Sequence, residues 1–268
     1  MKAAAFDFSR ASNINELTTL KEGEKFVAGN QSLGPMMNLR LVRANRLVDI
    51  ATLPALRKAN EHSNHVEFGA AVTHAEIEDG ETPDPANGWM KKAAANIAHR
   101  AVRNRGTIGG SLAHADPAAD WVIVLTGLDA KVALIGPDGE RKVNIEDFIT
   151  GPYTTVLKEN EFIASVEVPK RPTSACWGYW KFMRQVGEFA KASATVLIDQ
   201  ENGFYRCALG ALEGPPLVLP RPLDIIEGDL GPKKAVEDAL SVRKIASYDM
   251  HVAALERALE QAKEGLRL

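Results

Sequence analysis

Two short segments rich in glycine and hydroxyl side chains restrict this chain more than any other feature of its sequence. The first is Ala28–Pro35 (AGNQSLGP), which continues the apolar run Phe26–Ala28, and the second is Gly106–Ser111 (GTIGGS). Small residues after a strand let backbone N–H groups turn inward, and such a concave set of donors suits a diphosphate. Neither segment has the spacing of a Rossmann motif or a P-loop. Each segment alone is typical of a plain turn, whereas the pair leaves a turn and a phosphate site as equal alternatives.

The composition excludes several classes of protein. With 45% hydrophobic and 25% charged residues among 268, the chain is not a disordered one. A net charge of −3 gives no electrostatic signature of nucleic-acid binding. Met1–Arg10 lacks a basic region followed by an apolar one, so no secretion signal is expected there. No apolar run approaches the roughly 20 residues of a membrane span. The two cysteines, Cys176 and Cys207, are too few for a four-cysteine iron–sulfur cluster. We therefore expect a reduced, cytoplasmic protein without a membrane span.

Hydrophobic patterns and turn residues predict an α+β fold. The segment Trp89–Arg105 has many alanines and few helix breakers, so a helix is expected until Gly106. Asp116 and Pro117 are typical of a helix start, with Asp116 as the cap of a helix over Ala118–Leu128. Apolar runs predict strands at Phe26–Ala28, Leu47–Ile50 and Val66–Val72, and a hairpin at Ala130–Ile135 with Arg141–Ile145.

A proline-rich stretch divides the chain. The predicted strand Phe162–Val168 runs into Pro169–Pro172, the best candidate for a linker, and we place a domain boundary at residue 172. Beyond it the sequence predicts a three-stranded antiparallel sheet followed by two helices. The strands are expected at Trp177–Arg184, Ser193–Asp199 and Phe204–Leu212, and the helices at about Pro232–Val242 and Asp249–Arg267.

Longer stretches around the two segments resemble a known family. Ala28–Arg40 (AGNQSLGPMMNLR) and Thr107–Asp120 (TIGGSLAHADPAAD) resemble the two flavin-binding signatures of the FAD-binding (medium) subunit of molybdenum hydroxylases, the xanthine, carbon monoxide and nicotine dehydrogenase family. Phe68–Ile77 and Lys181–Ala190 fit the same pattern, so the resemblance covers nearly the whole chain. It implies an FAD-binding domain of the vanillyl-alcohol-oxidase/p-cresol-methylhydroxylase type over residues 1–172, then a smaller α+β domain over residues 173–268.

The resemblance also implies which residues hold the cofactor. The first segment would wrap the FAD diphosphate, and Thr107–Ser111 would form a second clamp and a floor for the ribityl chain. Asp120 matches a carboxylate on the polar tail, and Ile163 lies where the family contacts the adenine end. Lys181 aligns with a lysine near the flavin ring, and Phe189 with an aromatic residue against it. The implied cofactor-binding residues are Ala28, Gly29, Asn30, Gln31, Ser32, Leu33, Thr107, Ile108, Gly109, Gly110, Ser111, Asp120, Ile163, Lys181 and Phe189.

One residue departs from the family pattern. Asn30 stands where the usual A-G-G-x-S loop has its second glycine. Asparagine adopts left-handed backbone more readily than other non-glycine residues, so we expect the turn to persist. Its side chain is expected near the diphosphate, where it would weaken or re-aim FAD binding. FAD is expected to be non-covalent, although His114 lies within the second signature, because the resemblance is to non-covalent members.

The function that the resemblance implies is electron transfer. A partner subunit with a molybdenum cofactor would oxidise the substrate, and a small partner with [2Fe–2S] clusters would pass electrons through FAD to an external acceptor. The expected assembly is a heterotrimer that is doubled into a dimer of heterotrimers. No hydrolytic nucleophile–base set is evident, so no catalytic residue is assigned. Two alternatives stay open: a stand-alone flavin oxidase of the same fold, and a cofactor-free binding or maturation protein.

The remaining histidines and a basic group have simpler interpretations. His62, His65, His74, His99 and His251 show no metal-ligand spacing and are expected to be solvated or capping residues, so no metal site is predicted. Arg100, Arg103 and Arg105 precede the second segment. They could meet a phosphate or the acidic surface of a partner, but a solvated helix face is the preferred interpretation.

Overall fold

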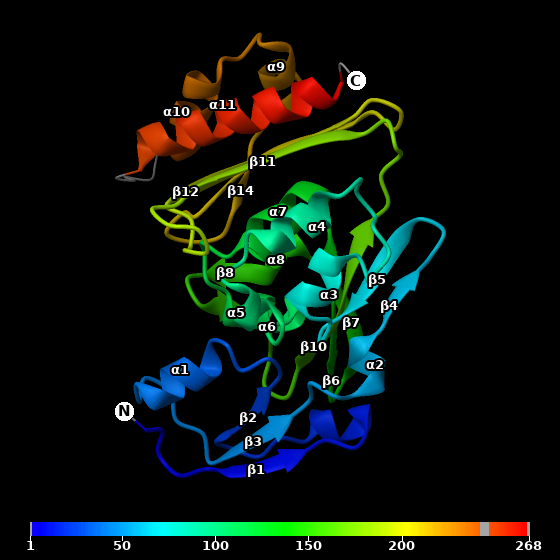
Figure 1. The fold of residues 1–268 in the computed structure, drawn as a ribbon, viewed down its shortest axis with the longest axis vertical. Helices are drawn as coiled ribbons and strands as arrows, with labels where there is room; N and C mark the ends of the chain where they lie inside the picture. The colour runs from blue at the N-terminus through cyan, green and yellow to red at the C-terminus, as the bar shows by residue number, and fades with distance from the viewer. Residues whose placement is uncertain (1, 242–246, 267–268) are drawn as a thin grey trace.

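The fold has three layers along the long axis of the molecule (Figure 1). The computed structural model describes residues 2–241 and 247–266. A small parallel sheet near the N-terminus forms one end, a larger antiparallel sheet with helices forms the middle, and an antiparallel sheet covered by helices forms the other end. The mixed helix-and-sheet architecture predicted from the sequence is confirmed.

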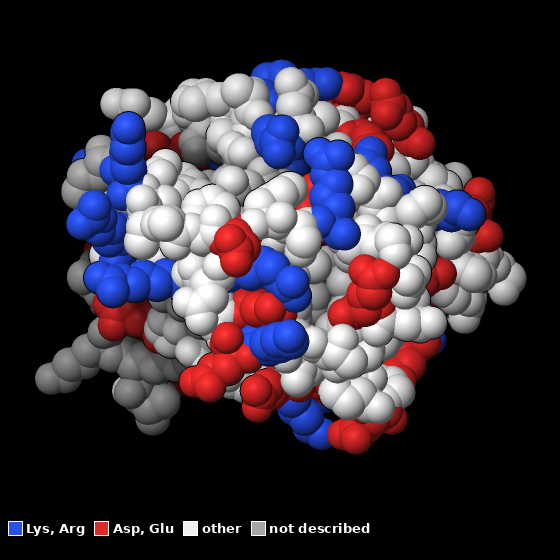
Figure 2. Space-filling model, turned by 90° about the horizontal axis from the view of Figure 1, so that it is seen from below, with Lys and Arg blue, Asp and Glu red and all other residues white. Residues whose placement is uncertain are grey.

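The N-terminal layer carries the first glycine-rich segment. Its strands pair in parallel in the order β1-β3-β2, and the chain leaves β2 directly into that segment before entering α1. The predicted strands at Phe26–Ala28 and Leu47–Ile50 are therefore confirmed to within about two residues. The bounds in this layer are β1 (Asp7–Arg10), a 3₁₀ helix (Ile14–Thr18), β2 (Glu24–Val27), α1 (Leu33–Asn38) and β3 (Arg46–Asp49). Figure 2 views this end of the molecule from below and shows basic and acidic side chains interspersed over it.

The middle layer is built on an antiparallel sheet with the order β4-β5-β10-β6-β7. The predicted hairpin between Ala130 and Ile145 is confirmed as β6 and β7, joined by Pro137 and Asp138, with Gly139 at φ +103° at the start of β7. The bounds are α2 (Pro54–Arg57), β4 (Ala59–Glu61), β5 (His65–Gly69), β6 (Lys131–Gly136), β7 (Gly139–Asn144), α8 (Ile145–Phe148), β8 (Ile149–Gly151), β9 (Thr154–Thr155) and β10 (Phe162–Pro169).

Two helix predictions in this layer need correction. The continuous helix over Trp89–Arg105 is wrong, because the chain forms α4 (Trp89–Ala95) and α5 (Arg100–Arg103) with Ala98 between them at φ +42°. The helix expected from Ala118 begins at Asp120, and its cap is not Asp116. Asp116 instead accepts a hydrogen bond from the Ala118 N–H within the preceding turn. The helices here also include α3 (His74–Asp79), α6 (Ile108–His114) and α7 (Asp120–Leu128).

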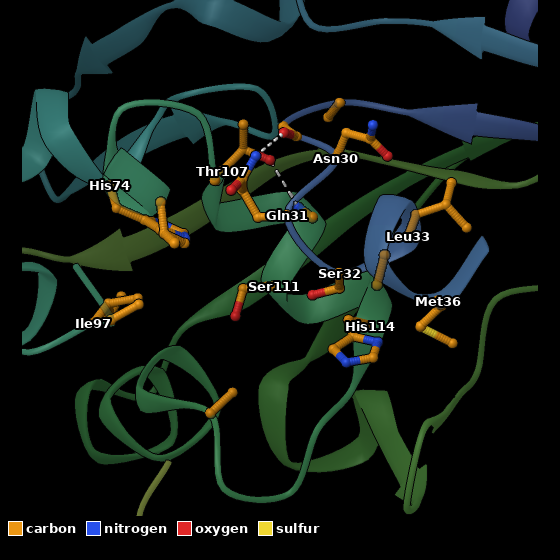
Figure 3. Close-up of a pocket in the computed structure, with 18 of the residues that line it drawn as sticks. Asn30, Gln31, Ser32, Leu33, Met36, His74, Ile97, Thr107, Ser111 and His114 are labelled. Atoms are coloured by element: carbon orange, nitrogen blue, oxygen red, sulfur yellow. Dashed lines mark hydrogen bonds between the residues drawn. The ribbon is translucent and has the colours of Figure 1, made fainter. Parts of the chain in front are cut away.

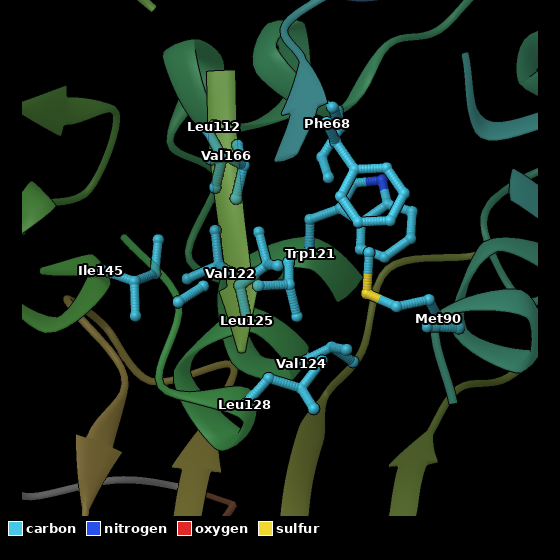
Figure 4. Close-up of a cluster of buried hydrophobic side chains, with 14 of the residues drawn as sticks. Phe68, Met90, Leu112, Trp121, Val122, Val124, Leu125, Leu128, Ile145 and Val166 are labelled. Atoms are coloured by element: carbon cyan, nitrogen blue, oxygen red, sulfur yellow. The ribbon is translucent and has the colours of Figure 1, made fainter. Parts of the chain in front are cut away.

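Helix α7 forms the centre of the main core. All nine of its residues are buried, and it lies between the middle sheet and the C-terminal sheet, contacting β10, β12 and β13. Trp121 and Leu125 pack with Phe68 and Met90 from the middle layer (Figure 4). A helix that is apolar on every face needs cover on every face. The two sheets supply that cover, and the start of α7 is thereby held in place beside the second glycine-rich segment.

The C-terminal layer is a four-stranded antiparallel sheet in the part of the chain that the structure describes, so the prediction of three strands was one short. The added strand has two residues, too few for a sequence pattern. The outer face of this sheet is covered by α11. The helix packs so closely on the sheet that a Cβ atom at Gly178 of the first strand would lie 1.8 Å from the Ala258 carbonyl oxygen. The bounds are β11 (Cys176–Phe182), β12 (Ala192–Asp199), β13 (Phe204–Gly210), β14 (Leu217–Val218), α9 (Pro222–Glu227), α10 (Pro232–Leu240) and α11 (Tyr248–Gly265).

Both predicted C-terminal helices are confirmed as α10 and α11, although their predicted last residues, Val242 and Arg267, lie outside the described residues. The predicted boundary at residue 172 falls between the end of β10 and the start of β11, and it stays a prediction. Across residues 2–241 and 247–266, no helix combines the length and the apolarity that crossing a bilayer requires.

Candidate functional site

A cavity of about 730 Å³ lies where the two glycine-rich segments meet. Its wall comes from the β2–α1 connection and from α6 and the residues before it (Figure 3). The loop between β11 and β12 adds Gly187, Glu188 and Phe189. The structure therefore brings together segments that are far apart in the sequence. The sequence-predicted residues that line the cavity are Ala28, Gly29, Asn30, Gln31, Ser32, Leu33, Thr107, Gly110, Ser111, Asp120 and Phe189.

The first segment presents free backbone donors. Among the described residues, the N–H groups of Gly29, Asn30, Gln31 and Ser32 donate to no protein acceptor. The loop is nevertheless ordered, because the Gln31 side chain donates to the Gly29 carbonyl at 2.9 Å and Asn30 adopts φ +61°. Consecutive N–H groups without protein partners that line a cavity are an anion-binding arrangement. The left-handed turn expected at Asn30 is confirmed, and its amide lies against Gly34.

The two segments touch through their backbones. A Cβ atom at Gly29 would lie 2.0 Å from the Arg105 carbonyl oxygen and 2.8 Å from the Gly106 Cα atom. Only glycine permits this approach, because main-chain atoms cannot rotate away from a methyl group. The position of the first segment is thus fixed directly by the residues that lead into the second.

The second segment is the N-terminus of a helix, which the sequence did not indicate. Thr107 caps α6 by accepting a hydrogen bond from the Gly110 N–H at 3.0 Å, while the Ile108 and Gly109 N–H groups donate to Val72 and Ala70. Its backbone donors are therefore largely occupied. What it offers the cavity is the bare surface of Gly110 and the hydroxyl group of Ser111, which lies in the same part of the cavity as Ser32 (Figure 3).

The two adjacent glycines of α6 differ in their surroundings, because Gly109 packs against backbone and Gly110 borders the cavity. We therefore expect their alanine variants to differ in stability and in ligand binding. A Cβ atom at Gly109 would lie 2.7 Å from the Ala70 carbonyl oxygen, whereas one at Gly110 would meet only the Thr107 hydroxyl, at 2.8 Å. We expect Gly109→Ala to lower the free energy of unfolding by about 1–3 kcal/mol. Gly110→Ala should change it by less than about 1 kcal/mol, because alanine favours a helix, while weakening ligand binding by narrowing the cavity.

Chemical denaturation and ligand titration of both variants measure this contrast. Equal losses of stability in Gly109→Ala and Gly110→Ala would contradict the assignment of one glycine to packing and the other to the cavity wall.

Asp120 lies at the base of the cavity, but its carboxylate is engaged within the protein. It accepts hydrogen bonds from the Lys181 ammonium at 2.8 Å and from the Tyr179 hydroxyl. Burial raises the pKa of Asp120, and the neighbouring ammonium and hydroxyl groups oppose that rise. Every contact of these oxygens is with a donor, which is the pattern of an ionised carboxylate. Any role of Asp120 toward a ligand stays a prediction.

Four predicted site residues lie off the cavity wall. Lys181, expected near a flavin ring, instead buries its ammonium group between Asp120 and the Asn96 carbonyl. Ile163, expected at the adenine end, is buried in the main core. Ile108 and Gly109 pack beneath the wall rather than on it. All four residues are buried in the protein interior, which explains why they do not reach the cavity.

Part of the cavity wall was not predicted from the sequence. His74, Ile97, Ala98 and Tyr153 line the cavity, and they come from α3, from the α4–α5 connection and from the β8–β9 turn. Tyr153 is 61% exposed at φ +55° and donates a hydrogen bond to Asp116. The single sequence signal for it was a Pro-Tyr turn, which does not distinguish a cavity wall from an ordinary loop.

The expectation of solvated or capping histidines is wrong for two of them. His251 is fully buried, and His74 is 5% exposed, with its ring against Trp121. Burial, with a smaller contribution from the Arg103 guanidinium, lowers the pKa of His74 from 6.5 to about 4. His114 lines the cavity beside Tyr153, with their ring centroids 5.2 Å apart.

The lowered pKa of His74 predicts a loss of stability in acid. The unfolded chain binds a proton near pH 6.5, whereas the folded protein binds it near pH 4. The contribution of neutral His74 to the free energy of unfolding is therefore fully present above about pH 7. It is lost progressively as the pH falls toward 4, by about 3 kcal/mol in all. Denaturation of the ligand-free chain across this range measures the effect. A His74→Asn variant should lose less stability over the same range, and an unchanged pH profile would contradict the prediction.

Two of the three arginines before the second segment pair with acidic residues of α3, whereas Arg105 is exposed. Arg100 pairs with Glu78 at 2.8 Å and with Asp79, and Arg103 pairs with Glu78 at 2.7 Å. The preferred interpretation as a solvated helix face is therefore wrong for Arg103, whose side chain is 13% exposed, while Arg100 stays 48% exposed. Arg100 and Arg103 together fasten α5 to α3. This pairing supports the connection that contains Ile97 and Ala98 on the cavity wall.

The cavity thus has a polar part and an apolar part. The polar part carries the free N–H groups and hydroxyls of the two segments, while Ile97, Ala98 and Val102 form an apolar wall beside them. A ligand with a diphosphate at its middle and a flat ring at one end fits both parts. Within the described residues, no three His, Cys, Asp or Glu side chains are arranged to hold a metal ion.

Comparison with known proteins agrees with this geometry. Residues 4–171 match the family described as the FAD binding domain in molybdopterin dehydrogenase. The chain is 34% identical over 263 residues to the nicotine 6-hydroxylase medium subunit of Paenarthrobacter nicotinovorans, covering 95% of this chain and 92% of that protein. It is also 34% identical over 201 residues to the carbon monoxide dehydrogenase medium chain of Hydrogenophaga pseudoflava, covering 74% and 70%.

Solved structures show the same likeness over the full length. Carbon monoxide dehydrogenase from Hydrogenophaga pseudoflava matches with a TM-score of 0.89 and 29% identity, covering 99% of both chains. Quinoline 2-oxidoreductase from Pseudomonas putida 86 matches with a TM-score of 0.86 and 28% identity, covering 100% of both. The chain therefore belongs to the FAD-binding medium subunits of the molybdenum hydroxylase dehydrogenases, and is a component of an oxidoreductase.

Proposed function

We propose that this chain is the electron-transfer subunit of a multi-subunit molybdenum-dependent dehydrogenase or hydroxylase. It would hold FAD non-covalently in the cavity, receive electrons from [2Fe–2S] clusters on a small partner subunit, and deliver them to an external acceptor. The substrate would be oxidised on a large partner subunit that carries the molybdenum cofactor. The observation that carries the proposal is the row of free N–H groups from Gly29 to Ser32, fixed against the start of the second segment.

The residues of the cavity fit the parts of FAD. The N–H groups of the first segment would hold the diphosphate, and the Ser32, Thr107 and Ser111 hydroxyls would complete that contact. Ile97 and Phe189 would contact the flavin ring from the apolar wall. Bound FAD supplies reversible redox chemistry, so the protein contributes binding, orientation and exclusion of water.

Dependence on partners follows from the cysteine content. A [2Fe–2S] cluster needs four protein ligands, and the chain has two cysteines. Both are free, and burial raises the pKa of Cys207 to about 12, so its thiol is not available as a thiolate. The clusters would therefore lie on other chains, as the term medium subunit in the names of the relatives supports. A heterotrimer that dimerises and a cytoplasmic location stay predictions.

Purification from the native host tests the proposal. The expected result is a yellow complex that contains this chain, iron, molybdenum and FAD, with the FAD released by acid precipitation. FAD retained in the acid pellet would contradict non-covalent binding. A colourless chain, unable to bind added FAD, would favour the maturation alternative. Reduction of the bound flavin by a small alcohol or amine, with no partner present, would favour the stand-alone oxidase.

A further inference from the structure

His74 occupies an unusual position on the cavity wall. It is the first residue of α3, and its backbone N–H donates to the Gly106 carbonyl at 2.9 Å, which fixes it beside the second segment. The side chain is 95% buried, since its exposed fraction is 5%. Figure 3 shows the imidazole reaching toward the cavity from the same side as Ile97.

The location of the proton on the imidazole follows from its partner. The Trp121 indole N–H points at His74 Nδ1, with the two nitrogens 3.0 Å apart. An indole nitrogen only donates, so Nδ1 must be the unprotonated acceptor. In the neutral ring the proton then resides on Nε2. The ring stays neutral at physiological pH, because burial holds the pKa of His74 near 4.

The Nε2–H group lacks an acceptor. Among the described residues, the bond to Trp121 is the one hydrogen bond that the imidazole makes, and it uses Nδ1. Gly106 leaves room for the other edge of the ring, since a Cβ atom there would lie 2.8 Å from Nε2. Nε2 is not one of the fully buried side-chain atoms without a partner, so this donor opens onto the cavity and not into the packed interior. This donor lines the cavity, so a ligand oxygen or nitrogen in the cavity can satisfy it.

The surroundings select the kind of acceptor. Ile97, Ala98 and Val102 make the neighbouring wall apolar, and the free N–H groups for phosphate lie on the first segment instead. A neutral donor in an apolar wall suits a neutral acceptor, because a phosphate would lose more hydration there than one neutral N–H restores.

We propose that His74 is a positioning residue that donates a hydrogen bond from Nε2 to a neutral acceptor in the ring-and-ribityl half of FAD. This inference rests on the proposed function. It adds a fixed donor, locked by Trp121, that orients the flavin independently of the diphosphate contacts.

Two conservative variants separate the tasks of the two ring nitrogens. In His74→Asn the amide oxygen replaces Nδ1, so the bond from Trp121 persists while the donor into the cavity is lost. In His74→Gln the amide nitrogen replaces Nε2, so the donor persists while Trp121 loses its acceptor. We expect His74→Asn to raise the FAD dissociation constant about 3- to 10-fold with little change in stability. His74→Gln should bind FAD like the parent chain but unfold at lower denaturant concentration.

The experiment uses the full chain, stripped of FAD and titrated with FAD and, separately, with ADP. ADP probes the diphosphate half alone, so its affinity should be equal in the parent chain and in His74→Asn. Vibrational spectra of the bound flavin should show shifted carbonyl bands in His74→Asn if the acceptor is on the ring, and unshifted bands if it is a ribityl hydroxyl. Either spectrum supports the proposal when the affinity contrast is present.

Equal FAD affinity in all three chains would overturn the proposal, as would equal weakening in both variants or a matching loss for ADP. Failure of the parent chain to bind FAD would instead overturn the proposed function, so the two failures are distinguishable.

Discussion

Replacing Gly29 with alanine is expected to abolish tight FAD binding. The new methyl group would lie 2.0 Å from the Arg105 carbonyl oxygen, where ordinary contact needs about 3.5 Å. The two segments must then separate by more than about 1 Å. Loss of two N–H contacts to the diphosphate would raise the dissociation constant about 100-fold, since charge-assisted bonds contribute about 1.5 kcal/mol or more each. Titration of the flavin-free variant with FAD measures this change.

Gly34→Ala is the matched control for that variant. It makes the same substitution in the same segment, but its added methyl would meet the flexible Asn30 amide at 2.9 Å instead of backbone. We expect its FAD affinity to stay within a few-fold of the parent. Similar losses in both variants would show that the contact between Gly29 and Arg105 does not hold the site together.

Local features of the cavity could be predicted from the sequence. The small residues after β2 and the left-handed turn at Asn30 depend on neighbouring residues alone, and both are found where expected. The same holds for the hairpin of β6 and β7, whose turn residues specify its geometry.

Features set by distant contacts could not be predicted. Alanine is a good helix former, so nothing local indicates that Ala98 adopts φ +42° and turns the chain onto the cavity wall. That turn follows from the pairing of α5 with α3, through residues more than 20 positions apart. His74 has an ordinary sequence context, and its role depends on Trp121, which lies 47 residues away. Likewise, the capture of Lys181 by Asp120 spans 61 residues.

Breaking that buried pair is expected to have the largest effect on stability. The Lys181 and Asp120 side chains are 3% and 5% exposed, and their contact joins α7 to β11 of the C-terminal sheet. In Asp120→Asn the ammonium group would stay buried with only amide and carbonyl oxygens around it. Removing one partner of such a pair costs about 3–5 kcal/mol, a large part of the stability of an ordinary domain.

The double variant Asp120→Asn, Lys181→Met separates charge from packing. A methionine at this position has about the length of the lysine stem but no charge, so no unpaired ion is left behind. Chemical denaturation should therefore find the double variant more stable than Asp120→Asn alone by about 2 kcal/mol or more. If the double variant is the less stable of the two, the lysine contributes through its bond to the Asn96 carbonyl rather than through the ion pair. The charged hydrogen bond from Lys181 to the Asn96 carbonyl, and not the ion pair, would then join β11 to the connection that lines the cavity.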